Sequence, residues 1–190
     1  DADGDGIPDQ DDALLFSTAS STWPKYIPKA NEDGNPDPLT SGTLLRLYNF
    51  TGPNAPQAEY FTNDTGTPIS MEQCHGWKRD ISKNHRIRGR VNEAWRDSFL
   101  FTRSHDVWEV FLGNGTYRVT VCIGDSEHEQ TGQNVALEGK PVFESVSTAA
   151  GMFAEATMEV TVADGRLTMD IGKVDSTTNT CVNWIRIVRP

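Results

Sequence analysis

The first twelve residues of this 190-residue chain carry carboxylates at a spacing that suits a calcium ion. They read Asp-Ala-Asp-Gly-Asp-Gly-Ile-Pro-Asp-Gln-Asp-Asp, with a Gly at position 6, where a short loop has to turn back on itself. Ca²⁺ prefers hard oxygen ligands, about six to eight of them. We therefore predict a Ca²⁺ site built from five carboxylates and one backbone carbonyl: Asp1, Asp3, Asp5, Ile7 (carbonyl), Asp9 and Asp12. The alternative is a solvated acidic linker.

Basic residues gather between positions 78 and 103, where eight Lys and Arg face three acidic residues, a local charge of +5. Arg binds sulfate and carboxylate groups through paired hydrogen bonds, and an aromatic ring can stack on the apolar face of a sugar. We predict a binding site for an anionic glycan in the irregular segment 75–96, with Trp77 or Trp95 as the stacking platform. Its predicted residues are His75, Trp77, Arg79, Arg88, Arg90 and Trp95. The alternative is that the arginines pair with nearby acids and only fasten this segment.

The loop Gly-Asp-Ser-Glu-His-Glu at 124–129 is a second candidate, in which Asp125, Glu127 and His128 could bond sugar hydroxyls or a structural Ca²⁺. A solvated turn is the alternative. Gly-Asp-Ser also begins the nucleophile block of one class of serine esterases, but no His follows His128 to complete it. The four His show no zinc spacing, and no carboxylate pair stands out as that of a glycosidase. We expect no enzymatic activity from this chain.

Composition and charge exclude several classes of protein. A net charge of −10 argues against nucleic-acid binding, and no apolar run approaches the ~18 residues of a membrane span. The chain has neither an initial Met nor a signal-peptide pattern and begins inside a motif, so we expect a fragment of a longer protein. Cys74, Cys122 and Cys181 lack metal-ligand spacing, and whether two of them form a disulfide is left open.

The elements that must position these residues are predicted to be β-strands. From Thr43 onward, apolar residues alternate with a period of two. Seven of them are expected to face one core: Trp108, Val110, Leu112, Tyr117, Val119, Val121 and Ile123. Gly113-Asn114-Gly115 predicts a hairpin, Glu138-Gly139 and Asp164-Gly165 predict further turns, and a last strand is expected at 181–188. Without a long amphipathic helix, the pattern predicts an all-β fold, an antiparallel β-sandwich or jelly roll.

Two parts of the chain resemble known families. The D-x-D-x-D-G-x-x-D-x-x-D spacing of residues 1–12 resembles the thrombospondin type 3 repeat, which acts as a calcium-dependent spacer between modules. Residues 43–190 resemble malectin-like and galactose-binding-like carbohydrate-binding modules. This second resemblance is carried by the order of Tyr48-Asn49-Phe50-Thr51-Gly52-Pro53, Gly76-Trp77, Leu112 to Val119, Gly124-Asp125, Val135 to Gly139, Asp164 to Leu167 and Asn183 to Ile187. It implies a sandwich that binds sugars, performs no chemistry and is attached to a secreted polysaccharide-degrading enzyme.

The sequence thus predicts three parts: a calcium loop at 1–12, a linker at 13–42 that packs on the domain, and a β-sandwich carbohydrate-binding module at 43–190. The expected function is non-catalytic binding of an acidic or sulfated polysaccharide, with Ca²⁺ as a stabilising ion and other domains of the same polypeptide as partners. The expected location is secreted or at the cell surface. The alternative is an adhesion or structural module that binds a protein.

Overall fold

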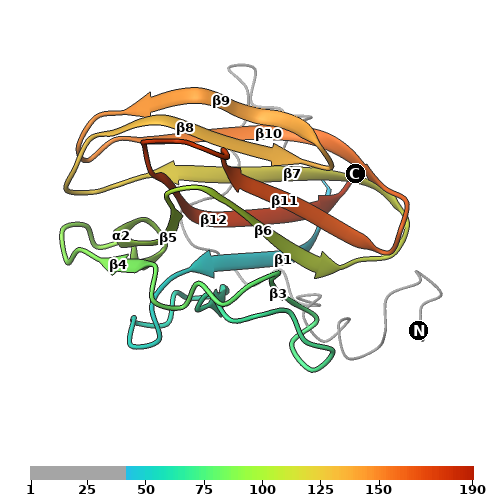
Figure 1. Cartoon of the computed structure of the whole chain (residues 1–190). Helices are drawn as coiled ribbons and strands as arrows, with labels where there is room; N and C mark the ends of the chain where they lie inside the picture. Colours follow the sequence, from blue (N-terminus) through green and yellow to red (C-terminus); the bar gives the residue numbers. More distant parts are fainter. Residues whose placement is uncertain (1–41) are drawn as a thin grey trace, which may run out of the picture.

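The computed structural model describes residues 42–190, which form two packed β-sheets (Figure 1). In the larger sheet the strand order is β10-β7-β12-β1-β2; β5 also pairs with β12, and β4 pairs with β5. Its strands are β1 (Thr43–Phe50), β2 (Thr62–Asp64), β4 (His85–Ile87), β5 (Ser98–Thr102), β7 (Gly115–Gly124), β10 (Phe153–Val162) and β12 (Thr180–Arg189). The last of these is the strand predicted at 181–188.

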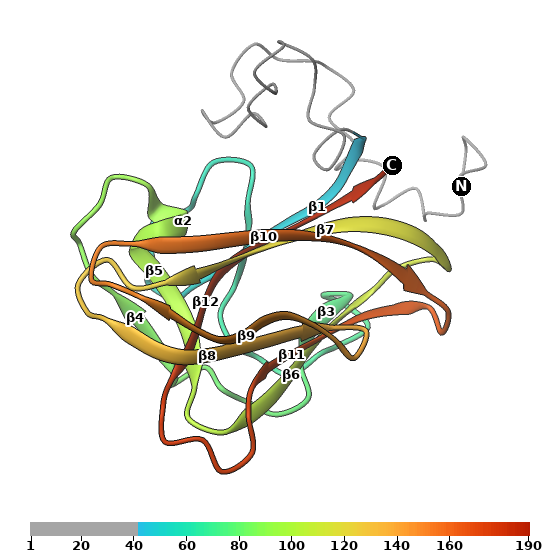
Figure 2. The same ribbon diagram turned by 90° about the horizontal axis from the view of Figure 1, so that it is seen from above.

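The second sheet has the strand order β3-β6-β11-β8-β9. Its strands are β3 (His75–Trp77), β6 (His105–Phe111), β8 (Gln130–Leu137), β9 (Lys140–Thr148) and β11 (Arg166–Gly172). Figure 2 shows the two layers, with β7 and β10 in one and β8, β9 and β11 in the other. Within the described part of the chain, the paired strands are antiparallel except β1 and β2. The predicted all-β sandwich is confirmed.

The calcium prediction lies outside the described residues. This holds for all six predicted ligands, Asp1, Asp3, Asp5, Ile7, Asp9 and Asp12, and for the predicted linker up to residue 41.

The main core fills the space between the sheets. All seven predicted core residues belong to it, and none is more than 5% exposed: Trp108, Val110, Leu112, Tyr117, Val119, Val121 and Ile123. Each fully buried aliphatic or aromatic side chain of this kind stabilises the fold by about 1.5–3 kcal/mol. The period-two alternation therefore identified the inward face of both strands correctly.

The turn Gly113-Asn114-Gly115 does not make the predicted hairpin. It carries the chain from β6 in the smaller sheet to β7 in the larger one, and β7 pairs with β10 and β12 instead. The turn at Asp164-Gly165 likewise joins β10 to β11 across the two layers. The Gly165 N–H donates to Asn114 Oδ1 at 2.8 Å, which ties the two turns together. By contrast, β8 and β9 form the true hairpin of this region, since they pair across Glu138 (φ 49°) and Gly139 (φ 71°).

Residues 75–102 are more regular than predicted. They contain β3, β4 and a four-residue helix, α2 (Ala94–Asp97), followed by β5, which the sequence pattern did not reveal. The Asp97 carboxylate accepts hydrogen bonds from the backbone N–H groups of Gly89 (2.6 Å) and Arg90 (2.7 Å), so it organises the turn between β4 and α2. The arginines that follow β4 therefore lie at the edge of the larger sheet.

Candidate functional site

Two of the predicted ligand-binding residues are part of the core. Trp77 is 0% exposed, and its indole Nε1–H donates to Asp64 Oδ1 at 2.9 Å. Trp108 donates to the other oxygen of Asp64 at 2.8 Å, and His75 is buried beside the same carboxylate, with Nε2 3.6 Å from Oδ2. The prediction that Trp77 is a stacking platform and His75 a ligand is therefore wrong. Burial leaves neither ring a face for a sugar.

One face of the Trp95 ring is covered by a neighbouring aromatic ring. On α2 it is half-buried, and its indole stacks on Phe61 with ring centres 5.5 Å apart and planes at 11°. Both rings cover a small cluster on the outer side of the larger sheet, around Leu47 and Trp184. A sugar could meet only the opposite face of Trp95, so its role as a platform stays a prediction.

The predicted arginines are held by acidic side chains. Arg79 Nη2 donates to Asp106 Oδ2 at 2.7 Å, and Arg90 pairs with Glu127 through Nε at 3.0 Å and Nη2. Arg90 and Glu127 influence each other's ionisation: their hydrogen bond raises the pKa of Arg90 and lowers that of Glu127. These pairs match the fastening role considered from the sequence. Whether Arg79 and Arg90 also bind a ligand stays a prediction.

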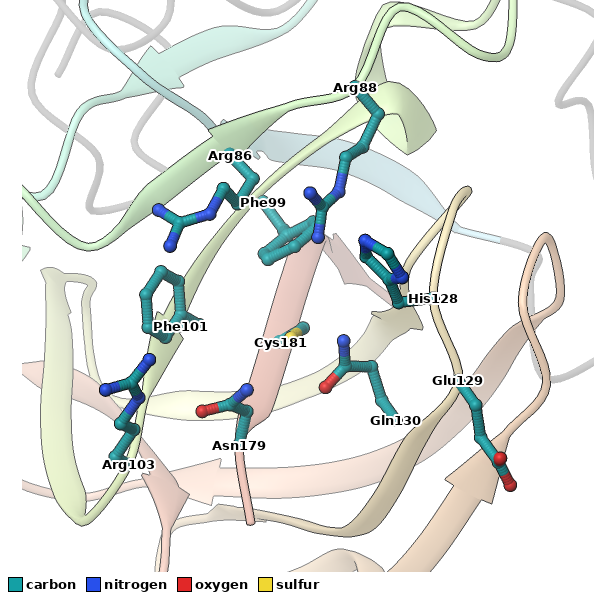
Figure 3. Close-up of a pocket in the computed structure, with 10 residues that line it drawn as sticks. All are labelled: Arg86, Arg88, Phe99, Phe101, Arg103, His128, Glu129, Gln130, Asn179 and Cys181. Carbon is teal, nitrogen blue, oxygen red and sulfur yellow. The ribbon is translucent and has the colours of Figure 1, made fainter.

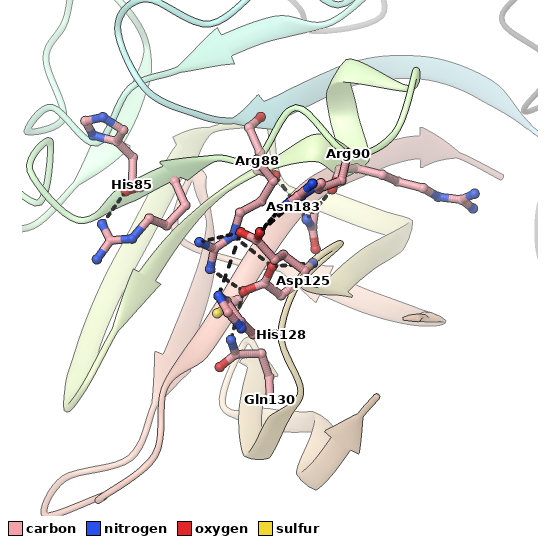
Figure 4. Close-up of polar contacts among 12 residues, drawn as sticks. His85, Arg88, Arg90, Asp125, His128, Gln130 and Asn183 are labelled. Atoms are coloured by element: carbon pink, nitrogen blue, oxygen red, sulfur yellow. Dashed lines mark hydrogen bonds and ion pairs between the residues drawn. The ribbon is translucent and has the colours of Figure 1, made fainter. Parts of the chain in front are cut away.

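The side chain of Asp125 is a centre of hydrogen bonding (Figure 4). It is 0% exposed and accepts Arg88 Nε at 2.9 Å, Arg88 Nη2 at 2.6 Å, Gln130 Nε2 at 2.9 Å and the Glu127 N–H at 2.9 Å. Burial alone would raise the pKa of Asp125, but the bonds from Arg88, Glu127 and Gln130 outweigh burial and lower it. The same pairing raises the pKa of Arg88. Asp125 is therefore charged, and its carboxylate is bonded by other groups of the protein.

A pocket of about 290 Å³ lies beside this centre (Figure 3). Its lining comes from β4 and β5 with their flanking residues, from the loop before β8 and from the start of β12. The lining residues are Arg86, Arg88, Phe99, Phe101, Arg103, His128, Glu129, Gln130, Asn179 and Cys181. Of the predicted residues, the structure thus brings together Arg88 and His128 in one pocket, with Asp125 directly behind them.

The base of the pocket is apolar and its rim is cationic. Phe99, Phe101 and Cys181 are nearly fully buried and form a small cluster of their own. The guanidinium of Arg86 lies 4.9 Å from the centre of the Phe101 ring, and that of Arg103 lies 5.9 Å from it. The ring thus holds both cations by cation–π attraction.

Arg86 and Arg103 differ from the other arginines of the basic segment. Arg86 donates to the His85 carbonyl, but neither it nor Arg103 forms an ion pair with any carboxylate of residues 42–190. The His128 ring is exposed near the pocket, with Nε2 3.7 Å from Glu127 Oε2. The pocket therefore presents positive charge, together with the amides of Gln130 and Asn179, to an incoming group.

Sequence reasoning missed most of this pocket. Its signal was the alternation along two short strands, where Arg86 and Arg88, and then Phe99, Phe101 and Arg103, fall on one face. No pattern in the sequence indicated that Asn179 would line a pocket. Burial raises the pKa of the Cys181 thiol, which therefore stays protonated, and all three cysteines are free.

Two classes of site are not found among residues 42–190. No group of three or more His, Cys, Asp or Glu side chains in that part could hold a metal ion. No helix there has the length and apolar character needed to cross a membrane.

The chain is similar in sequence to part of an agarase. β-Agarase A from Zobellia galactanivorans is 33% identical over 178 residues, which cover 92% of this chain and 26% of that protein. The chain thus spans about a quarter of the length of the relative it matches. No family model matches the chain.

Solved structures share the fold at low sequence identity. The YxiM protein of Bacillus subtilis superposes with a TM-score of 0.57 at 19% identity, over 76% of this chain and 40% of that one. The plant receptor-like kinase FER gives 0.57 at 12% identity, over 76% and 42%. A Bacteroides uniformis β-glucuronidase gives 0.54 at 10% identity, over 76% and 18%. The chain is therefore a β-sandwich of a widely used kind, similar in sequence to one part of an agarase.

Proposed function

We propose that this chain is a non-catalytic carbohydrate-binding module of a secreted, multidomain polysaccharide-degrading protein, and that it binds an acidic or sulfated polysaccharide. The observation that carries the proposal is the pocket with a buried phenylalanine base and a rim of two arginines without carboxylate partners in residues 42–190. An anionic sugar is complementary to this pocket, since its apolar C–H groups can contact the phenylalanine base and its acid group can pair with Arg86 and Arg103.

The similarity to β-agarase A supports the proposed class of protein. The aligned residues correspond to about a quarter of that agarase, so the similarity concerns one part of a larger polysaccharide-degrading protein. The shared sandwich fold is compatible with this role, but fold alone does not define function. Because the relative is an agarase, galactans are the first polysaccharides to compare.

The amino-terminal segment completes the proposal. We propose that Asp1, Asp3, Asp5, Ile7, Asp9 and Asp12 bind one Ca²⁺ that stiffens the connection to a neighbouring module. Six carboxylates within twelve residues support this proposal because they repel one another unless a cation neutralises them. An extracellular location follows from the proposed substrate, which is too large to enter a cell.

Affinity electrophoresis of the chain tests the binding function. Native gels would contain κ-carrageenan (a sulfated galactan), alginate (a carboxylated polymer) or neutral agarose at equal mass, with bovine serum albumin as the non-binding control. We expect retardation by at least one acidic polymer, which weakens as salt is raised past physiological strength, where the Debye length is about 8 Å. Unchanged mobility with every polymer would contradict the proposal and favour the alternative of a protein-binding module.

A further inference from the structure

The outer face of the larger sheet, which points away from the smaller sheet, carries buried side chains. Along β12, Ile185 and Ile187 belong to the main core. Arg186 and Val188 alternate with them and therefore lie on the outer side. Their exposed fractions are only 6% and 4%. In an antiparallel sandwich one face of each sheet packs on the core and the other usually meets water, so these two residues require a cover on the outer side.

The described part of the chain covers a neighbouring area of this face. There Phe61 and Trp95 pack with Leu47 and Trp184 in one apolar cluster. Val188 is buried as well, but it belongs to none of the three clusters of buried apolar side chains in the described chain. Its cover is therefore to be sought outside the described residues.

Burial on this face decreases from β12 towards the edge strand β10. Val188 pairs with Leu44 of β1 on one side and with Arg118 of β7 on the other. Arg118 in turn pairs with Glu159 of β10. Across this row, Val188 is buried, Arg118 is half-buried and Glu159 is exposed. The covered area therefore lies on the side of the sheet where β1 runs.

The chain enters the larger sheet beside this area. β1 begins at Thr43, opposite Arg189, and the start of β1 and the end of β12 lie side by side (Figure 2). Gly42 has a φ of 130°, and a Cβ there would clash with the carbonyl oxygen of Arg189, so the bend before β1 requires Gly. An extended chain covers about 3.3 Å per residue, and neighbouring strands are about 4.8 Å apart. Roughly ten residues before Gly42 therefore suffice to cross β1, β12 and β7.

The segment 13–41 is complementary to this surface in composition. Its first half carries six large apolar or aromatic side chains: Leu14, Leu15, Phe16, Trp23, Tyr26 and Ile27. All three of its acidic residues fall in its last ten residues: Glu32, Asp33 and Asp37. Arg118 and Arg186 carry positive charge on the outer face, so the acidic part of the segment is attracted to it.

We propose that the segment 13–41 docks on the outer face of the larger sheet, with apolar side chains on Val188 and acidic residues near Arg118 and Arg186. The sequence predicts only that this linker packs somewhere on the domain. Docking at this face makes the segment a third layer of the domain and holds the proposed calcium loop beside the sandwich. This role is independent of the proposed sugar binding.

Tryptic cleavage of the full chain tests this docking, because Lys25 and Lys29 are the only Lys or Arg in residues 1–41. Mass spectrometry would compare cleavage at both with that of a synthetic peptide of residues 16–34. We expect the protein to be cut there roughly tenfold or more slowly than the peptide, since cleavage follows the population of the open state. Equal rates would overturn the proposal. Protection that is lost on dilution would identify a second copy as the cover and would also overturn it.

Two matched variants test the surface. Val188→Asp places a charge opposite Arg118 on the outer face of the larger sheet, and Val107→Lys places one opposite Asp170 on that of the smaller sheet. We expect Val188→Asp to be cut nearly as fast as the peptide, and Val107→Lys as slowly as the parent. A Val188→Asp variant that melts cooperatively and keeps the parent's protection would overturn the assignment. Trp23→Ser, which leaves the sandwich unchanged, is the second variant, and protection relative to its own peptide would overturn the docking too.

Discussion

Replacing Arg88 with Ala is expected to destabilise the fold, because it leaves the Asp125 carboxylate buried without its counter-ion. Breaking a buried ion pair from one side costs about 3–5 kcal/mol. Asp125 still accepts the Gln130 amide and the Glu127 N–H, so we expect the lower end of that range, about 3 kcal/mol. For a domain of this size, that corresponds to a fall in Tm of roughly 6–12 °C.

Arg90→Ala is the matched control. Arg90 stands two residues further along and also pairs with an acid of the 125–130 loop, but its side chain is 59% exposed. An exposed pair contributes little, so we expect no measurable change in the free energy of unfolding. Urea unfolding followed by tryptophan fluorescence would give the midpoint and the m-value of both variants.

A double-mutant cycle completes the test. If Arg88 acts through Asp125, the Arg88→Ala/Asp125→Ala variant should be clearly more stable than the sum of the two single losses predicts. Equal midpoints for Arg88→Ala and Arg90→Ala, or strictly additive losses in the cycle, would refute the reasoning. The two arginines would then be equivalent surface charges.

Three further outcomes are expected. Asp5→Ala should abolish binding of one Ca²⁺ in calorimetry, and an unchanged titration would exclude the proposed loop site. Asp64→Asn should lower stability by about 2 kcal/mol or more in urea unfolding, because the amide can accept from only one of the two buried indole N–H groups of Trp77 and Trp108; Asp170→Asn, at a carboxylate that is 32% exposed, is the control. The pKa of Asp125 is lowered in the folded state, so its negative charge stabilises the fold at pH values above the ordinary pKa of 3.8. This stabilisation is lost as pH falls through the folded-state pKa, and Asp125→Asn should therefore lack it in acid unfolding. An identical dependence of stability on pH in the variant and the parent would contradict this.

The sequence predicted which side chains face inward, but not which strands pair. Alternation along β6 and β7 reports burial of one face, and both strands do bury Trp108 and Val121 in the same core. A glycine-rich turn looks the same whether it joins neighbours in one sheet or crosses to the other sheet. The strands that pair with β7 lie 29 or more residues away in sequence, and only the closing of the core determines them.

The candidate site was predicted in part, for the same reason. The basic segment was recognised, yet the arginines that are paired could not be told from those that are not. Arg88 meets Asp125 over a sequence distance of 37 residues, whereas Arg86, two positions earlier, meets no carboxylate of residues 42–190. Trp77 is a core residue rather than a stacking platform because it bonds the buried Asp64 on another strand, a partner that the local sequence does not reveal.

The position of β12 in the larger sheet bears on how the protein is made. This last strand of the described chain pairs with β1, β5 and β7, so it is an interior strand of the sheet. Its register joins Thr43 to Arg189, nearly the whole length of the domain apart in sequence. During synthesis the larger sheet cannot close until β12 has left the ribosome, and until then β1 and β7 expose unpaired edges. A chain that ends before β12 would therefore keep an open sheet, and proteases could cut it more easily than the complete fold.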